Sequence, residues 1–258
     1  MKIIIAPQSF KGSLTAKEAT KIISDCARNI FPDSELLGIP IADGGDGTLE
    51  TIIDATNGKL MNSQVKGPDN SFVKASWGIF NSEKNEKIGI IEMARASGLA
   101  LLEPKKLDPF NATSFGTGEL ILHAVKNGAK KIILGIGGSA TNDCGIGVAK
   151  AVGIKFLDSK NNEVNDNVSN FSNIKKINLD NFDTRLKDIK FEVACDVTNK
   201  LCGNEGASYI YGPQKGADPE EIKILDKNLL YIGNLIKKDL GINVLNIKGG
   251  GAAGGLGA

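Results

Sequence analysis

"KKIILGIGGSATNDCGIG", residues 130–147, joins an apolar run to a stretch of glycines and short polar residues. The run IIL is rich in β-branched residues, which is typical of a strand buried in a parallel sheet. The glycines and the Ser, Thr, Asn and Asp that follow offer little surface for packing but many hydrogen-bonding groups. The stretch therefore predicts a buried strand that ends in a ligand-binding loop.

The same loop also matches a dinucleotide-binding fingerprint, because residues 135–140 fit GxGxxA and Asp158 follows about twenty residues later. That fingerprint continues directly into a helix. Here Gly145 and Gly147 would lie in the first turns of such a helix, at a cost of about 1 kcal/mol each relative to alanine. We therefore interpret the stretch as a loop that presents N–H, hydroxyl and amide donors to a phosphate or a carboxylate.

The rest of the chain alternates apolar strands with amphipathic helices, a pattern that predicts an α/β protein. We expect strands in residues 2–6, 36–41, 71–80, 87–94, 130–136 and 189–197, of which 71–80 and 87–94 form an antiparallel hairpin. We expect helices in residues 15–31, 48–56, 117–128, 147–153 and 218–241. The run 2–6 predicts a buried parallel strand, whereas the asparagine-rich residues 158–181 predict an exposed segment with weak structure.

Composition excludes several classes of protein. The chain has 31 basic and 30 acidic residues, so its net charge of +1 gives no field that would attract nucleic acid or an anionic membrane. No run of about 18 apolar residues predicts a membrane span, and the N-terminus does not resemble a signal peptide. The four cysteines form no CxxC pair and there is a single histidine, which predicts free thiols and no zinc site. We expect a cytoplasmic protein, with its oligomeric state left open.

The first predicted strand is followed by a loop that favours anion binding. Ser9, Lys11 and Ser13 lie between the strand and the next helix, where backbone N–H groups and the helix dipole attract negative charge. The alternative is that Ser13 or Thr15 only caps the helix while Lys11 points into solvent. The loop is not a Walker A motif, because GxxxxGK[ST] is absent.

The second strand is followed by "PIADGGDGT", residues 40–48. Asp43 is suited to hold Mg²⁺ or to accept a proton from a substrate hydroxyl. Gly44 and Gly45 allow the backbone to approach a ligand closely. Asp46 is better interpreted as a helix cap.

Three further segments carry candidate site residues. Asp196 and Asn199 follow the strand 189–197, and an aspartate at a strand end is a common catalytic placement, although it is as often a cap. Gln214 and Lys215 lie between glycines. Arg95 is suited to neutralise a carboxylate substrate, or else it is an ordinary surface arginine. The hydroxyl residues before the helix 117–128 are interpreted as capping residues: Thr113, Ser114 and Thr117.

These loops share glycine, hydroxyl, amide, aspartate and lysine groups, and they lack a nucleophile–histidine pair. Such groups suit phosphoryl transfer, in which catalysis depends on positioning and on neutralising charge. The residues by themselves therefore predict a kinase or another phosphate-handling α/β enzyme.

Eight segments in this order resemble the bacterial glycerate kinase family, whose members phosphorylate D-glycerate with ATP. They are APQSFKGSL, PIADGGDGT, EMARASGL, TSFGTGELI, GIGGSATNDCGIG, ACDVTN, GPQKGA and GGGAAGGLGA. The resemblance runs from Met1 to Ala258. It implies a kinase that uses ATP and Mg²⁺ to make 2-phosphoglycerate, with 3-phosphoglycerate as the alternative product. It also implies two α/β domains with the site in the cleft between them.

We expect residues 1–60 to begin a Rossmann-like or flavodoxin-like parallel-sheet domain, and residues 61–258 to form a second, mixed α/β domain. The family usually continues beyond the position of Ala258 and completes the first domain there, so we expect that domain to be incomplete in this chain. Two positions depart from the family pattern: Gln8 stands where Asp is common, and Asp46 stands where Glu is common.

The resulting site hypothesis places Lys11 and residues 137–141 around phosphate. Asp43 or Asp196 accepts the proton of the glycerate hydroxyl or holds Mg²⁺. The candidate substrate-binding and nucleotide-binding residues are Ser9, Ser13, Gly44, Gly45, Arg95, Gly137, Gly138, Ser139, Thr141, Asn142, Asn199, Gln214 and Lys215. Two alternatives stay open: an NAD-binding oxidoreductase, and a non-catalytic small-molecule sensor derived from the kinase.

Overall fold

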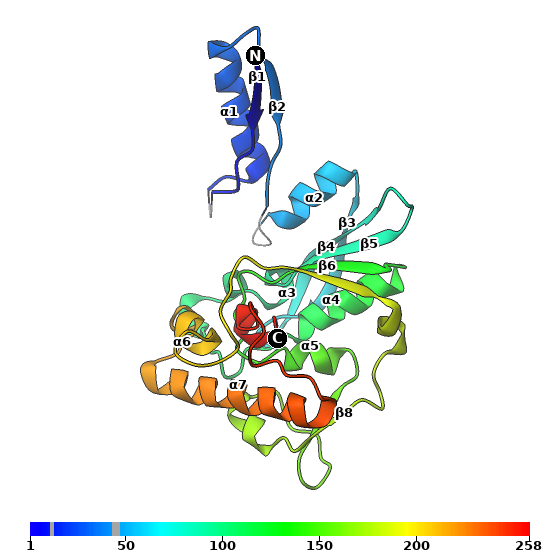
Figure 1. Ribbon diagram of the computed structural model, residues 1–258, viewed down its shortest axis with the longest axis vertical. Helices are drawn as coiled ribbons and strands as arrows, with labels where there is room; N and C mark the ends of the chain where they lie inside the picture. Colours follow the sequence, from blue (N-terminus) through cyan, green and yellow to red (C-terminus); the bar gives the residue numbers. More distant parts are fainter. Residues whose placement is uncertain (11–12, 43–46) are drawn as a thin grey trace.

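The computed structural model describes residues 1–10, 13–42 and 47–258, and its centre is a five-stranded sheet (Figure 1). The strands are β3 (Lys59–Lys66), β4 (Phe72–Asn81), β5 (Lys87–Glu92), β6 (Lys131–Gly135) and β9 (Lys190–Ala194), in the order β3-β4-β5-β6-β9. The first three are antiparallel neighbours, whereas β5, β6 and β9 are parallel. The sheet is therefore mixed, as the α/β prediction requires, and the predicted hairpin is confirmed as β4 and β5.

The three parallel strands end at the same edge of the sheet. Glu92, Gly135 and Ala194 are in register across β5, β6 and β9. Ligands of open α/β sheets bind outside the carboxyl ends of the strands. The fold therefore gathers the segments that follow these three strands in one place.

The described part of the chain contains the helices α1 (Ala16–Ile30), α2 (Thr48–Thr56), α3 (Ala94–Ser97), α4 (Phe115–Lys126), α5 (Ile146–Ala151), α6 (Ala207–Tyr211) and α7 (Pro219–Leu240). Two of them, α2 and α4, cover opposite faces of the sheet. Residues of α4 share a core with Ile91, whereas Leu49 of α2 packs against Ile90. Adjacent strand residues point to opposite faces, so these contacts place α4 and α2 on different sides.

Short 3-10 helices connect these elements: η1 (Leu99–Leu101), η2 (Pro104–Lys106), η3 (Val168–Asn173), η4 (Thr184–Asp188), η5 (Pro213–Lys215) and η6 (Ala252–Gly255).

The long helix α7 confirms the sequence prediction in detail. The Asp218 carboxylate accepts hydrogen bonds from the N–H groups of Glu220 and Glu221, and Gly241 ends the helix at φ 73°.

The expectation for residues 158–181 is wrong. The strands β7 (Lys155–Leu157) and β8 (Lys176–Asn178) pair antiparallel. Between them Val168 and Phe171 are fully buried in a core that they share with Leu225 of α7. In the sequence these apolar residues are spread among asparagines without a helical or strand period. Their burial depends on packing against α7, which is distant in the chain, so the sequence did not predict it.

The N-terminal residues form a separate βαβ unit. β1 (Lys2–Ile5) and β2 (Glu35–Gly38) are parallel, with α1 between them, and the carboxyl end of β1 points toward the five-stranded sheet (Figure 1). The parallel pairing is as predicted, but the expected burial of this strand is wrong for most of its residues, because Ile4 is 60% exposed and Ile5 alone of β1 is buried. The proposed domain boundary at residue 60 stays a prediction; α2, just before it, packs on the five-stranded sheet.

Two sequence expectations concern the whole molecule. All four cysteines have free thiols. Within the described ranges, no helix combines the length and the apolar composition needed to cross a bilayer.

Candidate active site

The segments after β6 and β9 leave the sheet side by side. Gly135 is paired with Ala194, and the N–H of Ile136 donates to the Ala194 carbonyl at 3.4 Å. Neighbouring strands lie about 4.8 Å apart, so Gly137 and Asp196, each two residues past the paired positions, begin adjacent segments. The structure thus brings together the two candidate regions that the sequence placed 59 residues apart.

The glycine-rich loop is held by its backbone at the tip. The N–H of Leu99 donates to the Gly138 carbonyl at 2.9 Å, and the N–H of Ala140 donates to the Ser97 carbonyl at 2.9 Å. In the part of the chain that the structure describes, the N–H groups of residues 137–139 have no hydrogen-bond partner. Gly138 is exposed. Three successive unpaired N–H groups at a strand end are suited to bind an anion.

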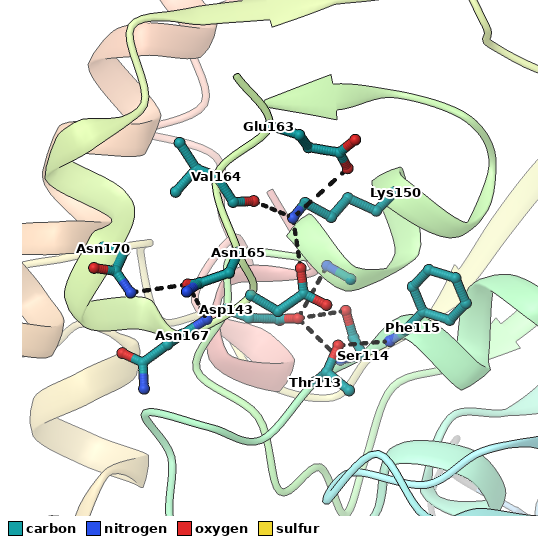
Figure 2. A network of polar contacts seen from close by, with 12 residues as sticks. Thr113, Ser114, Phe115, Asp143, Lys150, Glu163, Val164, Asn165, Asn167 and Asn170 are labelled. Atoms are coloured by element: carbon teal, nitrogen blue, oxygen red, sulfur yellow. Dashed lines mark hydrogen bonds and ion pairs between the residues drawn. The ribbon is translucent and has the colours of Figure 1, made fainter. Parts of the chain in front are cut away.

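Asp143 fixes the base of this loop (Figure 2). Its carboxylate is 2% exposed and accepts hydrogen bonds from Ser114 N at 2.9 Å and Ser114 Oγ at 2.7 Å. It also accepts from the N–H groups of Gly145 and Gly147, each at 3.1 Å. Burial raises the pKa of the Asp143 carboxyl, while the bonds from Ser114 and the glycines act in the opposite direction. This role of Asp143 could not be predicted from the sequence, because its burial follows only from the tertiary fold.

Ser114 was interpreted as a helix cap, and it occupies the N-cap position of α4 without capping through its side chain. Instead the Ser114 hydroxyl donates to Asp143 and accepts from the N–H of Val148 on α5 at 3.0 Å. Ser114 therefore links the loop to α4 and α5.

Lys215 lies beneath the loop and is 1% exposed. Its ammonium donates to Ser139 Oγ at 2.9 Å and to the Thr141 carbonyl at 2.5 Å. Burial lowers the pKa of Lys215 to about 7, and the Asp143 carboxylate acts in the opposite direction. Its neighbour Gln214 is exposed. Direct contact of either side chain with a ligand stays a prediction.

Two buried polar atoms of the loop have no hydrogen-bond partner within the described ranges. They are Thr141 Oγ1 and Asn142 Oδ1. The Asn142 amide nitrogen donates to Ser208 Oγ of α6 at 3.1 Å. An unsatisfied buried polar group costs about 1–3 kcal/mol, and native proteins commonly satisfy such groups with water or a ligand. The loop therefore has two buried oxygen atoms that are available to form hydrogen bonds with water or a ligand.

The segment after β9 presents its side chains differently. Asp196 is exposed. Asn199 Oδ1 accepts from the Tyr211 hydroxyl at 2.7 Å, and Asn199 Nδ2 donates to the Glu205 carbonyl at 2.8 Å. Burial raises the pKa of the Tyr211 phenol, and the nearby Asp196 carboxylate adds to this effect. Asn199 thus anchors the segment while the Asp196 carboxylate stays accessible.

Arg95 follows β5 and pairs with two carboxylates. Its Nε donates to Glu92 at 2.7 Å, and its Nη2 donates to Glu50 of α2 at 2.7 Å. Glu92 also accepts from the N–H of Leu49 at 2.7 Å, so this buried carboxylate ties the start of α2 to the end of β5. Burial raises the pKa of the Glu92 carboxyl, while the bonds from Leu49 and Arg95 act in the opposite direction. Glu50 is 45 residues from Arg95 in the chain, and Glu92, although only three residues away, is buried by the tertiary fold, so neither pairing follows from the sequence.

The glycine-rich end of the chain packs under both strand-end segments. The N–H of Cys144 donates to the Gly254 carbonyl at 3.0 Å, and the N–H of Gly251 donates to the Asn199 carbonyl at 2.9 Å. A Cβ on Gly254 would lie only 2.0 Å from the Thr141 carbonyl oxygen. Glycine is therefore required where this segment supports the loop.

An apolar groove of about 500 Å³ adjoins the same edge. It is lined by Ile41 before α2, by Ile52 of α2, and by Ile133 and Ala194 on the sheet. The groove connects the strand end that carries Asp196 with the segment that leads to α2.

Several predicted residues cannot be assigned to this arrangement. Lys11, Asp43, Gly44 and Gly45 lie outside the described residues. Ser13 is exposed, and Ser9 is half-buried in the segment that follows β1. A Cβ on Gly47 would lie 4.0 Å from the Ser9 Cβ, so this segment approaches the start of α2.

The donor set is compatible with Mg²⁺. Within the described ranges there is no group of three or more His, Cys, Asp or Glu residues that could hold a metal ion. Protein-bound Mg²⁺ commonly uses one or two carboxylates together with phosphate oxygens and water. The exposed Asp196 carboxylate is a group of this kind, and its role as a metal ligand stays a prediction.

Comparisons with known proteins agree on one family. Residues 3–258 match the glycerate kinase family. The chain is 49% identical to the glycerate 2-kinase of Escherichia coli (strain K12) and 46% identical to the glycerate kinase of Haemophilus influenzae, covering 100% of this chain and 67% of each relative. The crystal structure described as "putative glycerate kinase 2" from Salmonella typhimurium LT2 is 46% identical, with a TM-score of 0.89 over 100% of this chain and 68% of that one. The chain thus spans about two thirds of the length of these relatives.

Proposed function

This chain belongs to the glycerate kinase family, and on that premise we propose that it transfers the γ-phosphoryl group of ATP to D-glycerate, forming 2-phosphoglycerate. The match over residues 3–258 supports the reaction class, and the relative named glycerate 2-kinase favours the 2-phosphate over the alternative 3-phosphate. We also propose a cytoplasmic location, and a Rossmann-like domain that begins in residues 1–60 beside a mixed α/β domain of residues 61–258.

One observation carries the proposal: unpaired backbone N–H groups lie beside an exposed carboxylate at the same edge of the sheet. The N–H groups of residues 137–139 can hold a phosphate. Asp196 begins the adjacent segment and is accessible. Phosphoryl transfer depends chiefly on such positioning of phosphate and acceptor.

Asp196 has one of two roles in this proposal. It accepts the proton of the glycerate hydroxyl, or it is a ligand of Mg²⁺. When bound, Mg²⁺ neutralises charge on the phosphates. Asp43 is the alternative for either role, and Lys11 is proposed as a further phosphate contact.

Arg95 is proposed to hold the carboxylate of glycerate. Its partner Glu92 is buried, whereas Glu50 is the more exposed of the two. A substrate carboxylate would therefore replace Glu50 and leave the Glu92 pair intact. Ser9, Ser13, Gln214 and Asn199 complete the proposed set of substrate and nucleotide contacts, together with the loop residues Thr141 and Asn142.

The test is glycerate-dependent release of ADP, measured in a coupled assay and followed by ³¹P NMR of the product. Asp196→Asn should lower kcat at least about 100-fold, the range associated with a general base. Asp180→Asn, which changes an exposed aspartate in the segment after β8, is the matched control. Near-normal turnover by Asp196→Asn would remove this residue from the chemistry and leave Asp43→Asn as the decisive variant.

The same protein separates the alternative functions. Stabilisation against heat by Mg²⁺ and ATP, without an effect of NADH, would exclude the oxidoreductase. Binding of ATP and glycerate without ADP release would identify a sensor.

A further inference from the structure

Three charged side chains of the described residues are buried: Glu92, Asp143 and Lys215. Lys215 differs from the other two. Glu92 pairs with Arg95, and Asp143 accepts four hydrogen bonds. Within the described ranges, Lys215 instead donates only to a hydroxyl and a carbonyl and forms no ion pair. An ammonium without an ion-pair partner is expensive to bury, so this placement requires a reason.

The place of Lys215 in the fold supplies that reason. Its ammonium contacts residues 139 and 141, on either side of Ala140, and so braces the turn of the loop from inside. The same turn carries the unpaired N–H groups of residues 137–139. Lys215 therefore adds positive potential to an anion-binding turn while it is itself shielded from solvent.

The η5 turn ensures this placement. Gly216, at φ 95°, ends η5 and donates its N–H to the Pro213 carbonyl at 3.1 Å. The turn buries Lys215 and leaves its neighbour Gln214 exposed. A lysine at this position cannot reach a ligand unless the loop itself moves, so any effect on the ligand must act through the loop.

We propose that Lys215 is a positioning residue that shapes residues 138–141 for a phosphate, and that the bound phosphate supplies a negative charge in addition to the Asp143 carboxylate, with which Lys215 forms no ion pair. The inference rests on the proposed phosphoryl transfer, because it requires an anion at the loop. It replaces the expected direct contact of Lys215 with substrate by an action through the Ser139 hydroxyl and the Thr141 carbonyl.

A consequence is that anion affinity depends on the protonation of Lys215. Its pKa of about 7 in the unliganded protein means that much of the charge is lost at mildly alkaline pH. Asp143 is the ionisable group of the described residues that acts on Lys215. Its carboxylate raises the pKa of Lys215 and therefore supports the charged form.

The experiment measures binding of sulfate, whose charge does not change between pH 6.5 and 9, by the NMR shifts of the loop amides. For the wild type, the sulfate Kd should rise at least about 10-fold across this range, since only the charged lysine supports binding. Lys215→Met, which keeps the length of the side chain, should bind weakly at both pH values and show faster amide exchange in residues 137–141. Lys223→Met removes an exposed lysine of α7 and should behave as the wild type.

The outcomes are distinct. A wild type whose sulfate affinity is independent of pH, or that does not bind sulfate at the loop, overturns the inference even if Lys215→Met does not fold. Unchanged, pH-dependent binding by Lys215→Met overturns it as well. Sulfate binding needs neither ATP nor glycerate, so a protein that binds sulfate in this pH-dependent way but releases no ADP retains the inferred anion site and loses the proposed kinase activity.

Discussion

The loop after β6 and the segment after β9 leave adjacent strands at one edge, are both polar in sequence, and use that polarity in opposite ways. The side chains of Ser139, Thr141, Asn142 and Asp143 are all buried, so this loop offers ligands mainly its backbone. In the segment after β9, Asp196 is exposed and offers its carboxylate. The first region therefore presents backbone groups at this edge, and the second presents an ionisable side chain.

The difference follows from what covers each region. The loop after β6 lies among Ser114 at the start of α4, Ser208 of α6 and Gly254 near the end of the chain. β9 is an edge strand, with no strand beyond it in the sheet of the described residues. A polar residue in the loop must therefore find partners within the protein, whereas Asp196 can remain hydrated.

Substitution of Asp143 tests this contrast with the largest expected effect. Asp143→Ala leaves the Ser114 N–H and hydroxyl and the N–H groups of Gly145 and Gly147 buried without their acceptor. We expect a loss of about 3–5 kcal/mol in the free energy of unfolding. Urea denaturation measures the change. A variant with an unchanged urea midpoint would show that the loop does not depend on its buried carboxylate.

Substitution of Gly254 should have a smaller effect through the same loop. In Gly254→Ala, the new Cβ would lie 2.0 Å from the Thr141 carbonyl oxygen, so either the loop or the chain end must shift. We expect a loss of about 1–3 kcal/mol beyond the strain of an alanine at positive φ. Gly203→Ala is the matched control, because Gly203 also has positive φ but a Cβ added there would meet no atom within 4 Å. Equal shifts in Tm for both variants would contradict a supporting role for Gly254.

The sequence predicted most elements of the fold because their signals are local. The capping box at Asp218 and the left-handed Gly241 bound α7 as expected. It failed where packing between distant segments decides the outcome. β3 has too little apolar alternation to predict a strand, yet it pairs with β4 over its full length. Phe171 is buried in a core to which the distant helix α7 contributes, and Ile4 is exposed in a sheet of only two described strands.

The candidate site was predictable to the level of segments. The position of the loop after a strand identified residues 137–139 as donors, and the strand end identified Asp196. Which side chains face inward did not follow from the sequence, because Lys215 and Asp143 look as suited to a ligand as Asp196 does. Their burial depends on α4, α6 and the chain end, which are distant in sequence and meet only in the folded protein.

The smallest expected effect on stability is that of substitutions in the exposed segment after β9. The double variant Asp196→Asn, Thr198→Ala changes two exposed side chains and leaves the anchoring bonds of Asn199 to Tyr211 and Glu205 in place. We expect the free energy of unfolding to stay within about 0.5 kcal/mol of the wild type in urea denaturation, as for surface substitutions in general. A loss comparable to that of Asp143→Ala would show that this segment also supports the fold. An unchanged free energy of unfolding together with lost turnover would instead show that the segment after β9 contributes to the reaction and not to stability, in contrast to the neighbouring loop after β6.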